Sequence, residues 1–372
     1  MTDVAHVAAF AAGLVVVIGT TTSVLRNLVV PRRLRSRLVQ TVGRTVRLPY
    51  RVIAEHARTY VRRDRIQAWI GPTVILVVLV TWLLLYLVGY GLLVYAVSAT
   101  LPLRAAFREA GSSLFTLGFA STDRTQLTAV DFAAAITGPV VIGLQIGYLP
   151  ALYAAYNRRE SEVTMLESRA GEPNWGPEIL ARHSSISSVD NLRDLYRGWE
   201  HWAADVSESH SNYPVLIWFR SQEPTRSWVV GLLSVMDSAA LQLSLSPGLP
   251  QGEARLALRM GFSCMRDLAR TTGIPFNPDP SPDDPITLTY EDFLGGVARL
   301  ERGGFPIERP AEEAWPQFHG WRVNYEAIAY ALAERVDAVP ALWSGPRRGL
   351  REPVAPHTPV NRLPGGKTGA MS

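Results

Sequence analysis

The sequence is poor in cysteine, in lysine and in charge. Its 372 residues include one cysteine, Cys264, and one lysine, Lys367, and charged residues make up 19%. A single cysteine excludes an intrachain disulfide framework and a zinc site built from several cysteines. We interpret Cys264 as a buried small hydrophobe. Apolar residues reach 47%, which excludes a wholly disordered chain because this much apolar surface collapses in water.

The motifs of common enzyme classes are missing as well. The chain has no glycine-rich phosphate-binding loop, no nucleophile elbow and no cysteine-based metal motif. The closest approach to a metal site is a polar cluster on one predicted helix: Glu200, His201, Asp205, Glu208 and His210. His201 and Asp205 are four residues apart, which suits metal ligands, but pairing or capping at the helix surface explains the same spacing. We therefore expect no enzyme activity, no catalytic residue, no metal and no cofactor.

Three uncharged apolar runs are long enough to cross a bilayer. They cover residues 7–25, 72–97 and 132–156, with lengths of 19, 26 and 25 residues. About 20 apolar residues in a helix span a hydrocarbon core of roughly 30 Å, and backbone groups in lipid must be satisfied within the segment. A cleaved signal peptide is the alternative for the first run, but arginines follow this run instead of preceding it. We predict three transmembrane helices.

Positive charge is concentrated after the first run. Between Arg26 and Arg65 there are twelve arginines and two acids, so this stretch is +10 and the remainder of the +4 chain is −6. Short cytoplasmic loops collect arginine. We therefore expect a multi-pass protein of the cell membrane, with the N-terminus outside and the C-terminal part in the cytoplasm.

The basic stretch has helical spacing of its own. Four apolar residues recur every four positions among the arginines: Leu34, Leu38, Val42 and Val46. An apolar stripe beside a cationic face is typical of a helix lying on a membrane surface. We expect this segment to bind anionic lipids of the inner leaflet; a solvated linker is the alternative, and nucleic-acid binding is not expected.

The loop between the second and third runs begins with a short amphipathic helix. Five apolar residues fall on one helical face: Leu103, Ala106, Phe107, Ala110 and Leu114. This helix, about 12 residues long, cannot span a bilayer. It leads directly into Ser-Leu-Phe-Thr-Leu-Gly-Phe-Ala at residues 113–120.

This order of elements resembles the pore module of two-transmembrane-type potassium channels, over roughly residues 70–160. That family has an outer helix, a pore helix, a Thr-x-x-Thr-x-Gly-Tyr-Gly filter and an inner helix. The resemblance implies a re-entrant pore loop, a homotetramer, and potassium or another monovalent cation as the transported ion. The implied ion-selectivity filter is Thr116, Leu117, Gly118, Phe119 and Ala120.

The segment departs from the family pattern at several positions. Ser113 replaces the first Thr, Phe119 replaces the Tyr, and the following acid is displaced to Asp123. Ala120 replaces the second Gly, and a non-glycine residue in a left-handed conformation costs about 1–2 kcal/mol. The resemblance therefore leaves the choice between potassium and another monovalent cation open.

The literal filter tetrapeptide Val-Gly-Tyr-Gly occurs elsewhere, at residues 88–91 inside the second run. Using it as the filter would place the arginine-rich stretch outside the cell, so we interpret its glycines as helix-packing positions. In the third run, Thr137 and Gln145 share one face. One hypothesis has both residues lining an inner cavity; the other has Gln145 hydrogen-bonded to a neighbouring helix.

These observations predict an all-α membrane protein with three transmembrane helices, a re-entrant pore loop between the second and third, and an all-α cytoplasmic domain. Candidate cytoplasmic helices cover residues 188–209, 225–245, 251–272, 290–303 and 321–337. We expect five segments along the chain. They are an N-terminal transmembrane helix (1–30), a basic interfacial segment (31–70), a pore module (71–157), a helical cytoplasmic domain (158–345) and a disordered tail (346–372).

The function implied is passive cation conduction, with a regulatory or assembly role for the cytoplasmic domain. Two alternatives remain. A non-conducting scaffold with a degenerate pore loop is favoured by Ala120. A membrane-anchored sensor or enzyme acting through its C-terminal domain is favoured by the His201–His210 cluster.

Overall fold

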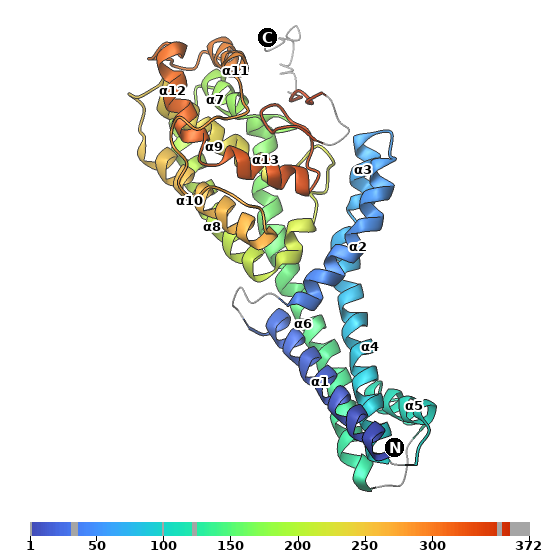
Figure 1. Cartoon of the computed structure of the whole chain (residues 1–372). Helices are drawn as coiled ribbons and strands as arrows, with labels where there is room; N and C mark the ends of the chain where they lie inside the picture. The colour runs from blue at the N-terminus through green and yellow to red at the C-terminus, as the bar shows by residue number, and fades with distance from the viewer. Residues whose placement is uncertain (1, 31–35, 99, 121–124, 348–351, 358–372) are drawn as a thin grey trace. The chain divides into compact units, whose positions relative to one another are not determined.

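The computed structural model describes five ranges of the chain (Figure 1): residues 2–30, 36–98, 100–120, 125–347 and 352–357. Within these ranges every regular element is a helix, and strand-type pairing is limited to two isolated bridges. The predicted all-α fold is therefore confirmed for the described residues. The chain divides into two compact units: unit 1 consists of Met1–Val52 and Trp69–Tyr153, and unit 2 of Ile53–Ala68 and Ala154–Ser372.

Unit 1 contains the long apolar helices. Its helices are α1 (Thr2–Leu28), α2 (Arg37–Glu55, except the last three residues), α4 (Ile70–Ser98), α5 (Leu103–Leu114) and the first part of α6 (Thr125–Ala170). The three helices that contain the predicted apolar runs, α1, α4 and α6, are long and apolar enough to cross a membrane. The chain thus has several helices suited to a bilayer.

Glycines bring the helices of unit 1 close together. A Cβ atom at Gly13 would lie 2.8 Å from the Gly89 carbonyl oxygen, and one at Gly89 would lie 2.7 Å from Val17. A Cβ atom at Gly91 would lie 2.9 Å from the ring of Phe107. The Val-Gly-Tyr-Gly tetrapeptide therefore lies inside α4, and its glycines are close-packing positions, as predicted.

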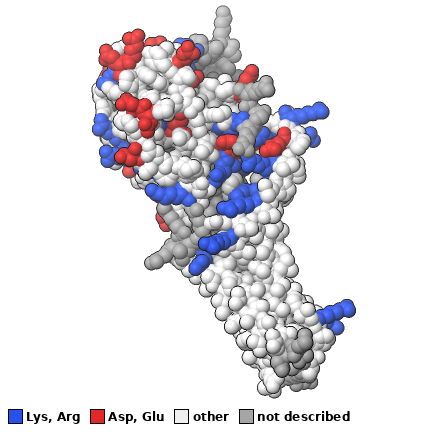
Figure 2. Space-filling model, viewed as in Figure 1, with Lys and Arg blue, Asp and Glu red and all other residues white. Residues whose placement is uncertain are grey.

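Much of the apolar surface of unit 1 is uncovered. Val15, Phe132, Ile136 and Ile146 are each more than 60% exposed, at 71%, 67%, 65% and 63%. Figure 2 shows a long, almost uncharged surface over the apolar helices of this unit. Exposed apolar helix faces of this extent mark a surface that lipid or another protein covers.

Unit 2 is a helical bundle. Its elements after the end of α6 are α7 (Gly176–Ser185), α8 (Leu192–Asn212), α9 (Trp228–Leu245), α10 (Gly252–Thr272), α11 (Tyr290–Arg302), α12 (Ala311–Arg322) and α13 (Glu326–Arg335), and α3 (Tyr60–Gln67) belongs to the same unit. Five of these helices overlap the predicted ranges. Helices α7 and α12 were not predicted, because each contains a proline: α7 starts at a Gly-Pro pair, and α12 contains Pro316.

The helix α9 forms the centre of the bundle. It is apolar and long enough to qualify as a membrane span, yet all of its residues are buried. Helices α7, α8, α10, α12 and α13 contact it. A helix that is apolar on all sides is buried in a core or in a membrane. The surrounding helices make α9 a core helix, and Cys264 is fully buried in the same core, as predicted.

Part of the expected tail is bonded to unit 2. The backbone N–H of Val354 donates to the Pro340 carbonyl at 2.6 Å, and that of His357 donates to the Glu172 carbonyl at 2.9 Å. The other tail residues expected to be disordered, 348–351 and 358–372, lie outside the described residues.

Candidate functional site

The predicted pore helix corresponds to α5. Pro102, in an extended conformation, precedes it, and the chain leaves the helix at Phe115. Of the five residues on the predicted apolar face, Ala106, Ala110 and Leu114 are fully buried, whereas Leu103 is 50% exposed. The periodicity seen in the sequence therefore identifies the face by which α5 packs in unit 1.

The chain folds back on the last turn of α5. The backbone N–H of Leu117 donates to the Ser112 carbonyl at 2.8 Å, and that of Thr116 donates to the Ser113 carbonyl at 3.0 Å. The N–H of Ala120 donates to the Ser112 hydroxyl at 3.0 Å. Together with the Phe115 amide, which donates to the Gly111 carbonyl at 3.1 Å, four amide groups of residues 115–120 are bonded to the end of α5.

Two residues of this segment are left-handed. Thr116 has a φ of 54° and Gly118 a φ of 68°, whereas Ala120 is not among the residues with positive φ. The expectation that Ala120 bears the left-handed strain is therefore wrong. Its amide is held by Ser112, and the strained residue is Thr116, a β-branched residue for which positive φ is uncommon. The Thr116 hydroxyl donates to the Phe115 carbonyl at 2.8 Å.

Four carbonyl oxygens of this segment have no partner among the described residues. Among the described residues, none donates a hydrogen bond to the carbonyl oxygen of Thr116, Leu117, Gly118 or Phe119. These four carbonyl groups therefore have no described donor.

Apolar side chains of the segment are exposed in the single chain. The exposed fractions are 41% for Phe115, 62% for Leu117 and 56% for Phe119. The Arg108 guanidinium lies 5.4 Å from the centre of the Phe119 ring. One side of the segment is therefore covered by α5, and its apolar side chains have room for a further partner.

The start of α6 supports the end of α5. A Cβ atom at Gly138 would lie 1.9 Å from the Leu114 carbonyl oxygen, so only glycine allows this approach. The Ser113 hydroxyl donates to the Asp131 carboxylate at 2.8 Å. This close contact of Gly138 with α5 was not predicted. The sequence shows only that Gly138 belongs to a Gly-Pro pair.

The two predicted cavity residues both lie in α6 but differ in their partners. The Thr137 hydroxyl lies 2.7 Å from the Tyr90 hydroxyl of α4, and it also donates to the Ala133 carbonyl at 2.7 Å. The Gln145 side chain is 5% exposed, and its Oε1 has no hydrogen-bond partner among the described residues. Both cavity roles remain predictions.

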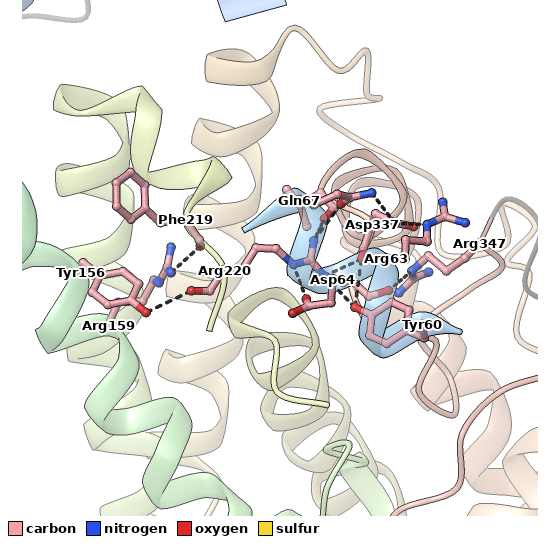
Figure 3. Close-up of polar contacts among 12 residues, drawn as sticks. Tyr60, Arg63, Asp64, Gln67, Tyr156, Arg159, Phe219, Arg220, Asp337 and Arg347 are labelled. Atoms are coloured by element: carbon pink, nitrogen blue, oxygen red, sulfur yellow. Dashed lines mark hydrogen bonds and ion pairs between the residues drawn. The ribbon is translucent and has the colours of Figure 1, made fainter. Parts of the chain in front are cut away.

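A second polar site lies within unit 2, where α3 meets the end of α13 (Figure 3). The Arg220 guanidinium donates to the Tyr60 hydroxyl at 2.7 Å, to Gln67 Oε1 at 3.1 Å and to the Asp337 carbonyl at 2.9 Å. It also forms an ion pair with Asp64. The Asp337 carboxylate accepts a hydrogen bond from the Gln67 side chain at 2.7 Å. We call this group the α3 cluster.

The α3 cluster was not predicted. Tyr60, Asp64 and Gln67 recur at spacings of four and three on one helix face, but the sequence alone gives no indication that Arg220 lies opposite them. Only two residues separate the end of α3 from the start of α4. The α3 cluster therefore holds the chain close to the start of an apolar helix.

A buried arginine holds α6 where its apolar run has ended. Arg159 is fully buried and donates to the Leu216 carbonyl at 2.9 Å and to the Phe219 carbonyl at 2.7 Å. His210 Nε2 lies 3.0 Å from the same guanidinium. Burial, with a smaller contribution from the Arg159 charge, places the pKa of His210 well below its ordinary value, so this ring is neutral.

The polar residues of α8 that suggested a metal site have different surroundings. Asp205 forms an ion pair with Arg158 at 3.0 Å, and His210 is buried against Arg159, while His201 is exposed. Within the described ranges, no three metal-ligating side chains gather at one place.

Comparison with known proteins gives no relative for this chain. No protein-family model, no curated protein and no solved structure matches it.

Proposed function

We propose that unit 1 forms a cation-conducting pore when four copies assemble, and that residues 116–120 line its narrowest part. The observation that carries this proposal is that the carbonyl oxygens of Thr116, Leu117, Gly118 and Phe119 have no donor among the described residues. Carbonyl groups without a partner are costly in lipid and are tolerated where they face water or a cation. Rings of backbone carbonyls replace the hydration shell of a conducted ion.

The need for several copies follows from the geometry of one segment. One copy of this segment contacts an ion from one side only, and Leu117 and Phe119 are more than half exposed in the single chain. Neighbouring copies around an axis supply the remaining oxygens and cover these side chains. The helix dipole of α5 places its negative end at the segment, which favours a cation there. The ion crosses passively, and potassium or another monovalent cation fits this chemistry.

Unit 2 has a regulatory or assembly role in this proposal, on the cytoplasmic side of the membrane. It is supported by the two places where unit 2 holds the chain next to apolar helices: Arg220 holds α3, which precedes α4, and Arg159 holds the extension of α6. A change in unit 2 thus reaches both helices through the chain itself.

Ion flux into proteoliposomes tests conduction. Wild-type protein is expected to pass monovalent cations, and Gly118→Val should reduce the flux at least tenfold because valine does not tolerate the left-handed conformation. Gly19→Val is the matched control, since no atom lies within 4 Å of a Cβ at Gly19. The assembly should have four times the 41.0 kDa mass of one chain.

Two outcomes would overturn the proposal. One is wild-type flux no greater than that of empty vesicles, which would favour a scaffold. The other is equal flux in wild type and Gly118→Val at equal assembly mass.

The role of the α3 cluster has its own test. Arg220→Gln should release α3, seen as faster hydrogen exchange over residues 60–67, and should change cation flux several-fold at unchanged assembly mass. Arg158→Gln is the matched control, because it removes an exposed ion pair of the same unit. Released α3 with wild-type flux would show that unit 2 does not act on the pore through this contact.

A further inference from the structure

The orientation of α2 about its own axis is fixed by contacts with α4. The Tyr50 hydroxyl lies 2.8 Å from the Thr73 hydroxyl, and a Cβ atom at Gly43 would lie 3.9 Å from Val74. Residues 43 and 50 are seven apart, so they mark one side of the helix. This side faces α4, and the remaining surface of α2 is directed away from it.

The outer surface of α2 combines arginine with exposed apolar side chains. Arg37, Arg44 and Arg51 are exposed and recur every seven residues, or about two helical turns, so they form a stripe along one side. Leu48 is 62% exposed and Val52 is 54% exposed. Leu48 follows Arg44 by four residues and precedes Arg51 by three, which makes these side chains neighbours on the helix. We call these five residues the α2 surface.

The α2 surface differs from the stripe predicted from sequence. Leu38, Val42 and Val46 are partly buried, and Leu34 lies outside the described residues. Exposed apolar side chains of α2 lie beyond that stripe: Leu48 and Val52 beside the arginines, and Ile53 at 56%. Packing against α4 therefore determines which apolar residues remain available to a partner.

The partner must satisfy both kinds of side chain at once. Within α2 the only acid is Glu55 in the last turn, so Arg37 and Arg44 have no acid within one turn of their own helix. Anionic phosphate suits the guanidinium groups, and an acyl layer directly beneath it suits Leu48 and Val52. Anionic phospholipid of a bilayer offers both in this order. The same unit contains α1 and α4, which are long and apolar enough to lie in that bilayer.

We propose that α2 binds anionic phospholipid at the membrane surface through the α2 surface. Arg37, Arg44 and Arg51 bind headgroup phosphates, and Leu48 and Val52 insert among the upper acyl segments. This inference needs unit 1 to lie in a membrane, but it does not depend on conduction. A loss of ion flux would leave it unaffected.

The buried thiol makes a direct test practical. Because Cys264 is fully buried and is the only cysteine, a Leu48→Cys variant of the full chain offers one accessible thiol. An environment-sensitive fluorophore at this position is compared in vesicles of phosphatidylcholine alone and of phosphatidylcholine mixed with phosphatidylglycerol. We expect a blue shift and stronger quenching by brominated lipid in the anionic vesicles, both reduced at high salt. Leu256→Cys in α10, 51% exposed, is the labelled control and should show neither change.

Arginine variants in the labelled background assign the effect. Arg37, Arg44 and Arg51 changed together to Gln should abolish the dependence on phosphatidylglycerol, whereas the same three changed to Lys should retain most of it. Arg255, Arg259 and Arg302, exposed in unit 2, changed together to Gln match the loss of charge and should leave the signal unchanged.

Three outcomes would overturn the proposal. They are a label at residue 48 that stays in water in both vesicles, a signal independent of phosphatidylglycerol, and a shift caused by an RNA oligonucleotide but not by anionic lipid.

Discussion

Helices α9 and α6 show two solutions to the same apolar composition. Both are long and apolar enough to cross a membrane. Every residue of α9 is buried by other helices of unit 2, whereas Ile136 and Ile146 of α6 are 65% and 63% exposed. A core helix therefore differs from a helix suited to lipid in whether other protein helices cover it, and not in its apolar content.

The two units also differ in how polar side chains hold their helices together. In unit 1, neutral groups join α1 to α4: Trp82 Nε1 donates to the Ser23 hydroxyl at 3.1 Å, and the hydroxyls of Thr21 and Tyr86 lie 2.9 Å apart. In unit 2, the fully buried Arg322 holds its helices by ionic bonds. We expect charge-removing variants to damage unit 2 most and packing variants to damage unit 1.

The largest expected effect is that of Arg322→Met in unit 2. The guanidinium is fully buried and donates to Asp237 at 2.5 Å, to Glu326 at 2.6 Å and to the Trp343 carbonyl at 2.7 Å. Removing it leaves two buried carboxylates without their cation, which should lower the free energy of unfolding by about 3–5 kcal/mol. Denaturant unfolding of the full chain in detergent, followed by tryptophan fluorescence, measures the loss.

The matched control for this variant is Arg302→Met, which alters an exposed arginine of the same unit. We expect its effect to lie within about 0.5 kcal/mol of zero. Equal losses for the two variants would mean that buried ion pairs do not distinguish unit 2.

The positions of the main helices could be predicted from the sequence, but the contacts between them could not. The apolar runs and the period of α5 follow from local spacing, so both could be predicted. The contact of Arg220 with Asp64 joins residues more than 150 positions apart, and no local pattern encodes it. Hydropathy likewise does not reveal that α9 is enclosed by protein, because enclosure depends on the other helices.

A smaller effect, in unit 1, is expected for Gly13→Val. A Cβ atom at Gly13 would lie 2.8 Å from the Gly89 carbonyl oxygen, which is backbone and does not move aside easily. The overpacked contact between α1 and α4 should cost about 1–3 kcal/mol. Thermal unfolding in detergent measures it, and Gly19→Val on the same helix, with open space around its Cβ, should have little effect. A larger loss for Gly19→Val would place the α1–α4 contact elsewhere.

The candidate filter shows the same limit of prediction at the level of single residues. The resemblance implied a filter at residues 116–120, and within it Gly118 has a left-handed φ. The pattern assigned the strain to Ala120, because the family has glycine there. The Ser112 hydroxyl, eight residues earlier, bonds the Ala120 amide, and Thr116 becomes left-handed instead. Such side-chain to backbone bonds depend on how the chain folds back, which residue types alone do not specify.

The smallest expected effect concerns pH and again separates the units. His210 is held neutral because burial and Arg159 lower its pKa well below the ordinary value of about 6.5. Below pH 6.5 the unfolded chain binds a proton that the folded chain does not, so stability is lost as pH falls, by at most about 1.4 kcal/mol per unit. Asp237 acts in the opposite direction, since burial raises its pKa to about 6 and favours the protonated folded form.

The His210 contribution is therefore measured as a difference between variants. The free energy of unfolding of wild type minus that of His210→Gln should decrease as the pH is lowered from 7.5 to 5.5, because glutamine does not titrate. His201→Gln, at an exposed position of the same helix, leaves Asp237 and Arg159 in place and should give a difference that does not change with pH. If the two differences change with pH in the same way, the buried His210 ring is not the group that makes unit 2 sensitive to acid. Burial of charged groups then distinguishes the two units less sharply than the contacts of Arg322 suggest.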